Sequence, residues 1–238
     1  MYDLKRTARM TGLLYLGIAI TGMVSFLVIR GQLYVVDDPM ATLTNLTDNP
    51  TVAKLGIAAE LGVVLTQALT AVWFYKLFRL ANPVAAGAIA AFGLMNSAAI
   101  LGSSAFLTTA LGVAGDATLA PGGDAAATVQ LMYTISGNFW TAGAIFFGLW
   151  LIPMGYVAKR SAWMPKTLGW ILMISGVGYV ASAFVGATLP DATVLNEVLT
   201  FPASVGEFWM IGYLLIVGVR SSAGAGTIED TTAKEHRV

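Results

Sequence analysis

The sequence predicts an all-α polytopic membrane protein, a bundle of six transmembrane helices. Three observations lead to this fold class. Of the 238 residues, 57% are hydrophobic and only 11% are charged, against roughly 25% charged in an average soluble domain. The mean hydropathy is +0.75. The apolar residues also gather in runs of about 20 residues or more, the length that crosses a hydrocarbon layer of about 30 Å as a helix.

These runs define six predicted spans in order along the chain. They cover residues 11–29, 53–77, 84–113, 128–157, 167–188 and 199–219. Basic residues precede the first run, as in a signal peptide, but Arg30 follows it in place of a small-residue cleavage pattern, which favours a retained span. The membrane domain is therefore predicted over 1–220. The polar segment 221–238 has too little apolar surface to pack and is predicted to be a disordered cytoplasmic tail.

The distribution of basic residues predicts the orientation of the spans. Arg30 and Lys54 lie on one side of the predicted membrane. The other eleven of the thirteen basic residues fall on the opposite side, at Lys5, Arg6, Arg9, Lys76, Arg79, Lys159, Arg160, Lys166, Arg220, Lys234 and Arg237. That side is expected to be cytoplasmic, and an even number of spans then places both termini there. The formal net charge is zero, so no nucleic-acid partner is expected.

The residue types that carry most enzyme chemistry are scarce. Cysteine is absent, which excludes disulfides, thiolate metal sites and cysteine nucleophiles. The single histidine, His236, lies in the polar tail. Nucleotide-binding, metalloprotease and serine-hydrolase motifs are also missing. We therefore expect no catalytic residue, no metal site and no cofactor, and an enzyme is the less expected class.

A few polar side chains fall inside the predicted spans, where a carboxylate costs roughly 2.5–3.5 kcal/mol and should face protein or a water-filled cavity. Glu60 and Glu207 are the carboxylates of this kind, and Asn138 lies at a similar predicted depth. Protonation, or a partner such as Arg30 or Lys54, would compensate the glutamates. Gln67 lies seven residues after Glu60, on nearly the same helix face, and the indoles of Trp140 and Trp209 follow Asn138 and Glu207 by two residues. The predicted ligand-binding group therefore comprises Glu60, Asn138, Glu207, Gln67, Trp140 and Trp209. The alternative is that these polar groups only join helices through hydrogen bonds.

Short segments in alternate spans suggest a repeat of three helical hairpins. Residues 137–143 (GNFWTAG) resemble residues 206–212 (GEFWMIG), and both begin in the external third of their predicted spans. The second span carries only 59–62 (AELG) at that depth, without the aromatic pair. Because short matches arise by chance in a glycine-rich apolar chain, an origin from three hairpins and an unrepeated bundle stay equal alternatives.

Longer strings resemble one family, and together they extend from Arg9 to about Val219. The strings are 9–16 (RMTGLLYL), 54–60 (KLGIAAE), 146–156 (FFGLWLIPMGY), 160–169 (RSAWMPKTLG) and 176–179 (GVGY). In them the chain resembles the bacterial integral-membrane family catalogued as domain of unknown function 4386. The resemblance implies a multi-pass protein of the bacterial inner membrane, and it transfers no catalytic residue.

Three functions stay open at this point. The leading hypothesis is a non-enzymatic protein of the lipid bilayer that binds or passes a small solute or ion through an externally open polar pocket. Six spans are few for a secondary transporter, so a homodimer is a possible assembly. The alternative is an accessory subunit docked on a membrane partner, for which the small residues of 87–93 are suited. An intramembrane enzyme is the least expected, because no His, Cys or metal ligand accompanies the glutamates.

Overall fold

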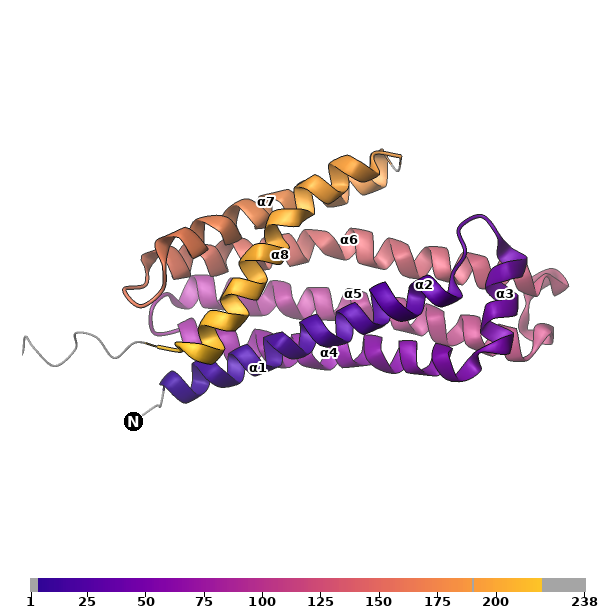
Figure 1. Cartoon of the computed structure of the whole chain (residues 1–238), viewed down its shortest axis with the longest axis horizontal. Helices are drawn as coiled ribbons and strands as arrows, with labels where there is room; N and C mark the ends of the chain where they lie inside the picture. Colours follow the sequence, from indigo (N-terminus) through magenta and orange to yellow (C-terminus); the bar gives the residue numbers. More distant parts are fainter. Residues whose placement is uncertain (1–3, 190, 220–238) are drawn as a thin grey trace, which may run out of the picture.

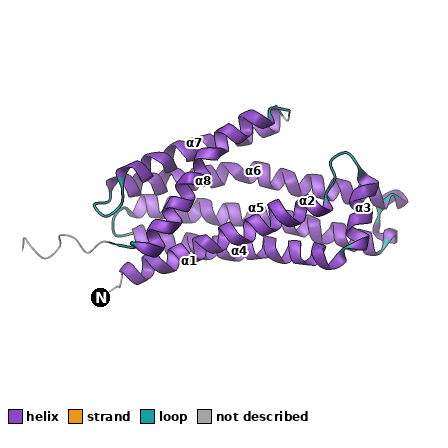
Figure 2. Ribbon diagram, in the orientation of Figure 1, coloured by secondary structure: helices purple, strands orange, loops and turns teal. Residues whose placement is uncertain are grey.

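Long apolar helices run side by side in the computed structural model of the chain, which describes residues 4–189 and 191–219 (Figures 1 and 2). Six helices within these ranges are long and apolar enough to cross a membrane. The predicted fold class is confirmed, and the protein is a multi-pass membrane protein. His236 and the predicted tail 221–238 lie outside the described residues.

The first span is one continuous helical stretch in three segments. It begins as α1 (Leu4–Gly22), continues as a π-helical segment η1 (Met23–Ile29) and ends as α2 (Arg30–Leu33). A π-helix places more residues in each turn than an α-helix and therefore rotates the faces of the segments that it joins. In η1, Ser25 and Ile29 are buried, and both lie close to Gly56 of the next span.

A short helix, α3 (Pro39–Asp48), follows the first span and lies across one end of the bundle (Figure 1). Asp38 caps its start, because the Asp38 carboxylate accepts a hydrogen bond from the Ala41 N–H at 2.9 Å. The remaining long helices are α4 (Pro50–Phe78), α5 (Pro83–Gly115), α6 (Ala125–Arg160), α7 (Lys166–Thr188) and α8 (Thr193–Ile216). Two short 3-10 turns, η2 (Ala117–Leu119) and η3 (Pro121–Gly123), connect α5 to α6.

Several helices begin where the sequence supplies a cap. The Asn82 side chain accepts from the Ala85 N–H at 3.0 Å before α5, and the Asp124 side chain accepts from the Ala127 N–H at 2.9 Å before α6. Such caps satisfy amide groups that have no partner inside the helix. In α8, Pro202 lies inside the helix. The helix starts at Thr193, earlier than residue 199, where the sequence places the start of the sixth span.

Each long helix packs against its neighbours in sequence, and α1 also contacts α8. Helices α6 and α7 approach each other closely, because they meet through glycines. A Cβ added to Gly148 would lie 2.5 Å from the carbonyl oxygen of Gly176, and a Cβ added to Gly155 would lie 2.5 Å from that of Gly169. We call these four residues the glycine seam. It holds the two backbones closer than any larger residue would allow.

The two ends of the bundle differ in what they contain. The start of α1, the α4–α5 turn, the α6–α7 loop and the end of α8 lie together at one end, and α3 lies at the opposite end with η2 and η3 (Figure 1). The α7–α8 turn stands away from α3 (Figure 1), while the end of α7 stays beside α6, where a Cβ on Gly186 would lie 2.9 Å from the Thr141 side chain. As a result, α8 crosses from this separate tip to the N-terminal end of α1, where a Cβ on Gly12 would touch Leu214.

Candidate ligand-binding site

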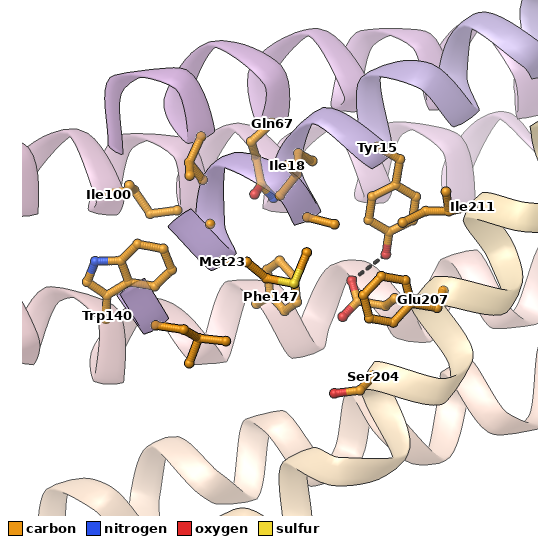
Figure 3. Close-up of a pocket in the computed structure, with 15 residues that line it drawn as sticks. Tyr15, Ile18, Met23, Gln67, Ile100, Trp140, Phe147, Ser204, Glu207 and Ile211 are labelled. Atoms are coloured by element: carbon orange, nitrogen blue, oxygen red, sulfur yellow. Dashed lines mark hydrogen bonds between the residues drawn. The ribbon is translucent and has the colours of Figure 1, made fainter. Parts of the chain in front are cut away.

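A cavity of about 290 Å³ lies inside the bundle, between the first span and helices α4, α5, α6 and α8 (Figure 3). Most of its lining is apolar, with Ile18, Val63, Ile100, Phe147 and Ile211 among the residues that form the wall. The polar residues that line it are Tyr15, Gln67, Ser204 and Glu207. Ligand sites in proteins usually measure roughly 300–1,000 Å³ and combine an apolar wall with few polar groups. The cavity therefore suits a small molecule.

Glu207 and Tyr15 form the polar end of the cavity (Figure 3). The Tyr15 hydroxyl donates a hydrogen bond to Oε1 of Glu207 and so connects α1 to α8. Tyr15 is buried and packs edge-on against Phe74 and Trp150, with ring centroids 5.6 and 5.5 Å away. This packing fixes the position of the hydroxyl. Among the described residues, Oε2 of Glu207 has no hydrogen-bond donor, so the carboxylate retains an acceptor on the cavity side.

Gln67 of α4 forms a second polar point in the wall. Its side chain is fully buried, and neither its amide oxygen nor its amide nitrogen has a hydrogen-bond partner within the part of the chain that the structure describes. A buried polar group without a partner costs about 1–3 kcal/mol. Gln67 lines the same cavity as Glu207. The wall of the cavity therefore contains an unpaired donor and an unpaired acceptor.

The cavity opens on the side of the bundle, between η1 and α8. Its deep residues are buried, whereas its rim residues Met23, Leu27, Ser204 and Phe208 are exposed. The opening arises because α8 touches α1 near Gly12 and then leads away from η1 (Figure 1). In a chain of membrane-spanning helices this lateral surface faces the lipid rather than the water at either end.

Glu60 belongs to a separate buried group behind the cavity wall. Its side chain is 1% exposed, and its carboxylate accepts hydrogen bonds from the Ser103 hydroxyl at 3.0 Å and from the Trp140 indole N–H at 3.1 Å. The Ser103 and Ser136 hydroxyls share a further hydrogen bond of 2.7 Å. The carboxylate in α4 is thereby joined to both α5 and α6.

Arg30 completes the Glu60 group from the first span. Its guanidinium donates to the Ser136 hydroxyl at 3.0 Å and to the Tyr133 carbonyl at 2.7 Å. It also lies 5.5–5.7 Å from the ring centroids of Phe26, Tyr34 and Tyr133, within the range of cation–π attraction. The positive charge therefore reaches Glu60 through two serine hydroxyls.

The structure divides the predicted ligand-binding residues between these two groups. Glu207, Gln67 and Trp140 line the cavity, and Glu60 lies in the second group. Trp140 belongs to both, because its N–H bonds to Glu60 while its ring forms part of the cavity wall (Figure 3). The described residues show no hydrogen bond between Glu60 and Glu207.

Asn138 and Trp209 do not join either group. Asn138 is exposed on α6, and Trp209 is 39% exposed on α8. Asn138 follows Ser136 by two positions, and Trp209 follows Glu207 by two. Two helical positions correspond to a rotation of about 200°, which turns a side chain to the opposite face. The two residues have a suitable depth, but they point away from the cavity and from Glu60.

Several contributors are missing from the sequence-based group, among them Tyr15, Ser103 and Ser136. Ser136 precedes Trp140 by four positions, so the two share a helix face. That spacing is the signal that identifies Ser136 in place of Asn138. Tyr15 lies inside an apolar run, and only its contact with Glu207 across helices reveals its role.

Comparison with known proteins identifies the family of this chain but no individual relative. No curated protein and no solved structure matches the chain. The model of one family, described as a domain of unknown function, matches residues 10–218, a range that includes the cavity and the whole Glu60 group. This match covers most of the chain and confirms the resemblance found in the sequence strings. The chain therefore belongs to the DUF4386 family.

Proposed function

We propose that the protein binds a small, largely apolar molecule inside the membrane and holds the polar group of that molecule with Gln67 and Glu207. The observation that carries this proposal is the Gln67 amide, which is fully buried in the cavity wall with its donor and its acceptor both unpaired. The apolar wall would accept the body of the ligand, and the few polar groups would fix its orientation.

The ligand is proposed to reach the cavity sideways, from the lipid. Exposed Met23 and Leu27 on η1 and Phe208 on α8 form an apolar rim, which suits a molecule dissolved among acyl chains. This route differs from the externally open polar pocket expected from the sequence. A π-helical segment at the rim also favours a binding role, because such segments are frequent at functional sites.

The proposed setting is the bacterial inner membrane, with both chain termini in the cytoplasm. The basic residues Lys5, Lys76 and Lys166 support this orientation, because they belong to elements that meet at one end of the bundle (Figure 1). The positive-inside rule assigns that end to the cytoplasm.

A cavity-filling variant tests the proposal. Gly22 lines the cavity, and a Cβ placed there would have only one neighbour, a Val63 methyl at 4.0 Å, so Gly22→Leu would extend a side chain into the open volume. The matched control is Gly31→Leu in the same span, where a Cβ meets nothing within 4 Å and which does not line the cavity. The probe is 2-phenylethanol, which has an apolar body and one hydroxyl that both donates and accepts.

The measurement is the thermal unfolding temperature of each protein in lipid nanodiscs at rising probe concentration. Binding to the folded state raises this temperature in a saturable way. The wild-type protein and Gly31→Leu are expected to show that rise, and Gly22→Leu is expected to lose it. A rise of the same size in Gly22→Leu would refute binding in the cavity.

A further inference from the structure

The described residues that line the cavity carry negative charge and no positive charge. Glu207 is the only charged residue among those described that line it, and neither Lys nor Arg does so. A carboxylate held in apolar surroundings is costly unless a positive group or several hydrogen bonds compensate it. Tyr15 supplies one hydrogen bond to Oε1, and Oε2 has no donor among the described residues. The carboxylate is therefore suited to a positive partner from outside the chain.

Arg30, in the last segment of the first span, is already used elsewhere. Arg30 donates to Ser136 and to the Tyr133 carbonyl, and it does not line the cavity. The same residue shows how this protein holds a cation inside the bundle, because three aromatic rings surround its guanidinium at 5.5–5.7 Å. The partly buried positive charge in the first span is thus stabilised by ring faces together with polar acceptors.

The cavity repeats this combination of rings and acceptors without a cation of its own. Its aromatic lining residues are Tyr15, Trp140, Phe147 and Phe208. Ring faces attract a positive charge within about 6 Å, most strongly when the charge has lost its water. The Gln67 amide oxygen adds an acceptor that is buried and unpaired. Negative charge, ring faces and a carbonyl-type acceptor all favour the same sign of ligand charge.

We propose that the cavity selects an organic monocation, a small apolar molecule whose ammonium-type group lies between the Glu207 carboxylate and the aromatic wall. This inference rests on the proposed function, because it names the ligand class of the same cavity. Neutral molecules of the same shape bind more weakly, and anions such as fatty acids are rejected by Glu207.

Three probes of nearly equal shape test the charge selection. Benzyltrimethylammonium carries a permanent positive charge, neopentylbenzene is its neutral carbon analogue, and 3-phenylpropanoate is an anion of similar size. Each is titrated into full-length protein in nanodiscs of zwitterionic lipid. Its Kd comes from the saturable rise in unfolding temperature, and the probes are compared at equal concentration in the membrane. The cation is expected to bind at least about tenfold more tightly than the neutral analogue, and the anion is expected to give no saturable rise.

Two variants assign the selectivity to the carboxylate. Glu207→Gln is expected to weaken the cation to the level of the neutral analogue and to leave the neutral analogue unchanged. Glu197→Gln is the matched control, because Glu197 lies on the same helix, is exposed and is not part of the cavity.

The outcomes separate this inference from the proposed function. Equal affinity for the cation and the neutral analogue in the wild-type protein would overturn the charge selection and leave binding in the cavity in place. Saturable binding of none of the three probes would overturn both. Because the three-probe comparison uses the unmodified protein, it decides the question even if Glu207→Gln fails to fold.

Discussion

The indole N–H of Trp140 donates a hydrogen bond to the Glu60 carboxylate at 3.1 Å, while the ring of the same side chain forms part of the cavity wall. Trp140→Phe would keep an aromatic wall and remove the donor. We expect a loss of about 0.6–2 kcal/mol in the free energy of unfolding, the range found for interhelical hydrogen bonds in membranes. The measurement is thermal unfolding in detergent. Trp209→Phe, at an exposed indole, is the control, and equal stability of the two variants would contradict the role of this bond.

Ser103 is the central contact of the Glu60 group, since its hydroxyl bonds both to Glu60 and to Ser136. Ser103→Ala would leave both neighbours short of a partner, so we expect it to cost about 1–2 kcal/mol of stability. Ser104→Ala is the control, because the Ser104 hydroxyl bonds only to the Leu101 carbonyl of its own helix, at 2.9 Å. Thermal unfolding compares the two variants. If Ser104→Ala is as damaging as Ser103→Ala, the network between helices is not what stabilises this region.

Arg30 requires a planar guanidinium, because it makes two directed hydrogen bonds and lies beside three rings. An ammonium group cannot reproduce that geometry. Arg30→Lys is therefore expected to lower the free energy of unfolding by about 1–3 kcal/mol despite its conserved charge. Lys54→Gln removes a charge from an exposed position on α4 and is expected to change stability by less than about 0.5 kcal/mol. If Arg30→Lys is as stable as the wild-type protein in urea or thermal unfolding, a positive charge alone is sufficient here and the guanidinium geometry is not required.

The sequence predicts the spans well because helix length and apolar composition are local properties. A run such as 84–113 is long enough to cross the membrane whatever it packs against. The structure bears this out with six long apolar helices. The start of α8 was predicted less well, because the tolerance of Pro202 inside that helix depends on its surroundings.

The candidate site was predicted only in part, because the sequence gives the depth of a residue along its helix but not which face of the helix packs toward the neighbouring helices. Glu207, Gln67 and Trp140 do line one cavity. Asn138 lies at a similar position along its helix but on the wrong face, and Ser136 occupies the face that meets Arg30. The π-helical segment η1, which lies at the rim of the lateral opening, leaves no distinctive residue pattern in the sequence.

The orientation of the bundle can be tested with single cysteines, because the chain has none of its own. Ala81 lies in the α4–α5 turn and Ala117 in the connection between α5 and α6; both are exposed, and they lie at opposite ends of the bundle. A membrane-impermeant maleimide added to intact spheroplasts is expected to label Ala117→Cys and to label Ala81→Cys only after permeabilisation. The reverse pattern would show that the basic end faces outward, against the positive-inside rule.

The glycine seam makes the sharpest prediction about packing. Gly148 and Gly155 lie seven residues apart on α6 and face Gly176 and Gly169 of the antiparallel α7, so each pair sets the distance between two backbones. A methyl group at Gly148 meets a carbonyl oxygen at 2.5 Å, and backbone moves aside less readily than a side chain. Gly148→Ala is therefore expected to cost about 1–3 kcal/mol of unfolding free energy.

The matched control for the seam is Gly87→Ala on α5, where a Cβ meets nothing within 4 Å. There the methyl group reduces the freedom of the unfolded chain and adds helix propensity, so a gain of about 0.5–1 kcal/mol is expected. If thermal unfolding shows that Gly148→Ala loses stability and Gly87→Ala gains it, the loss is due to close backbone contact and not to the general effect of replacing glycine. If both variants gain stability, α6 and α7 can move apart at no cost, and the seam does not set their distance.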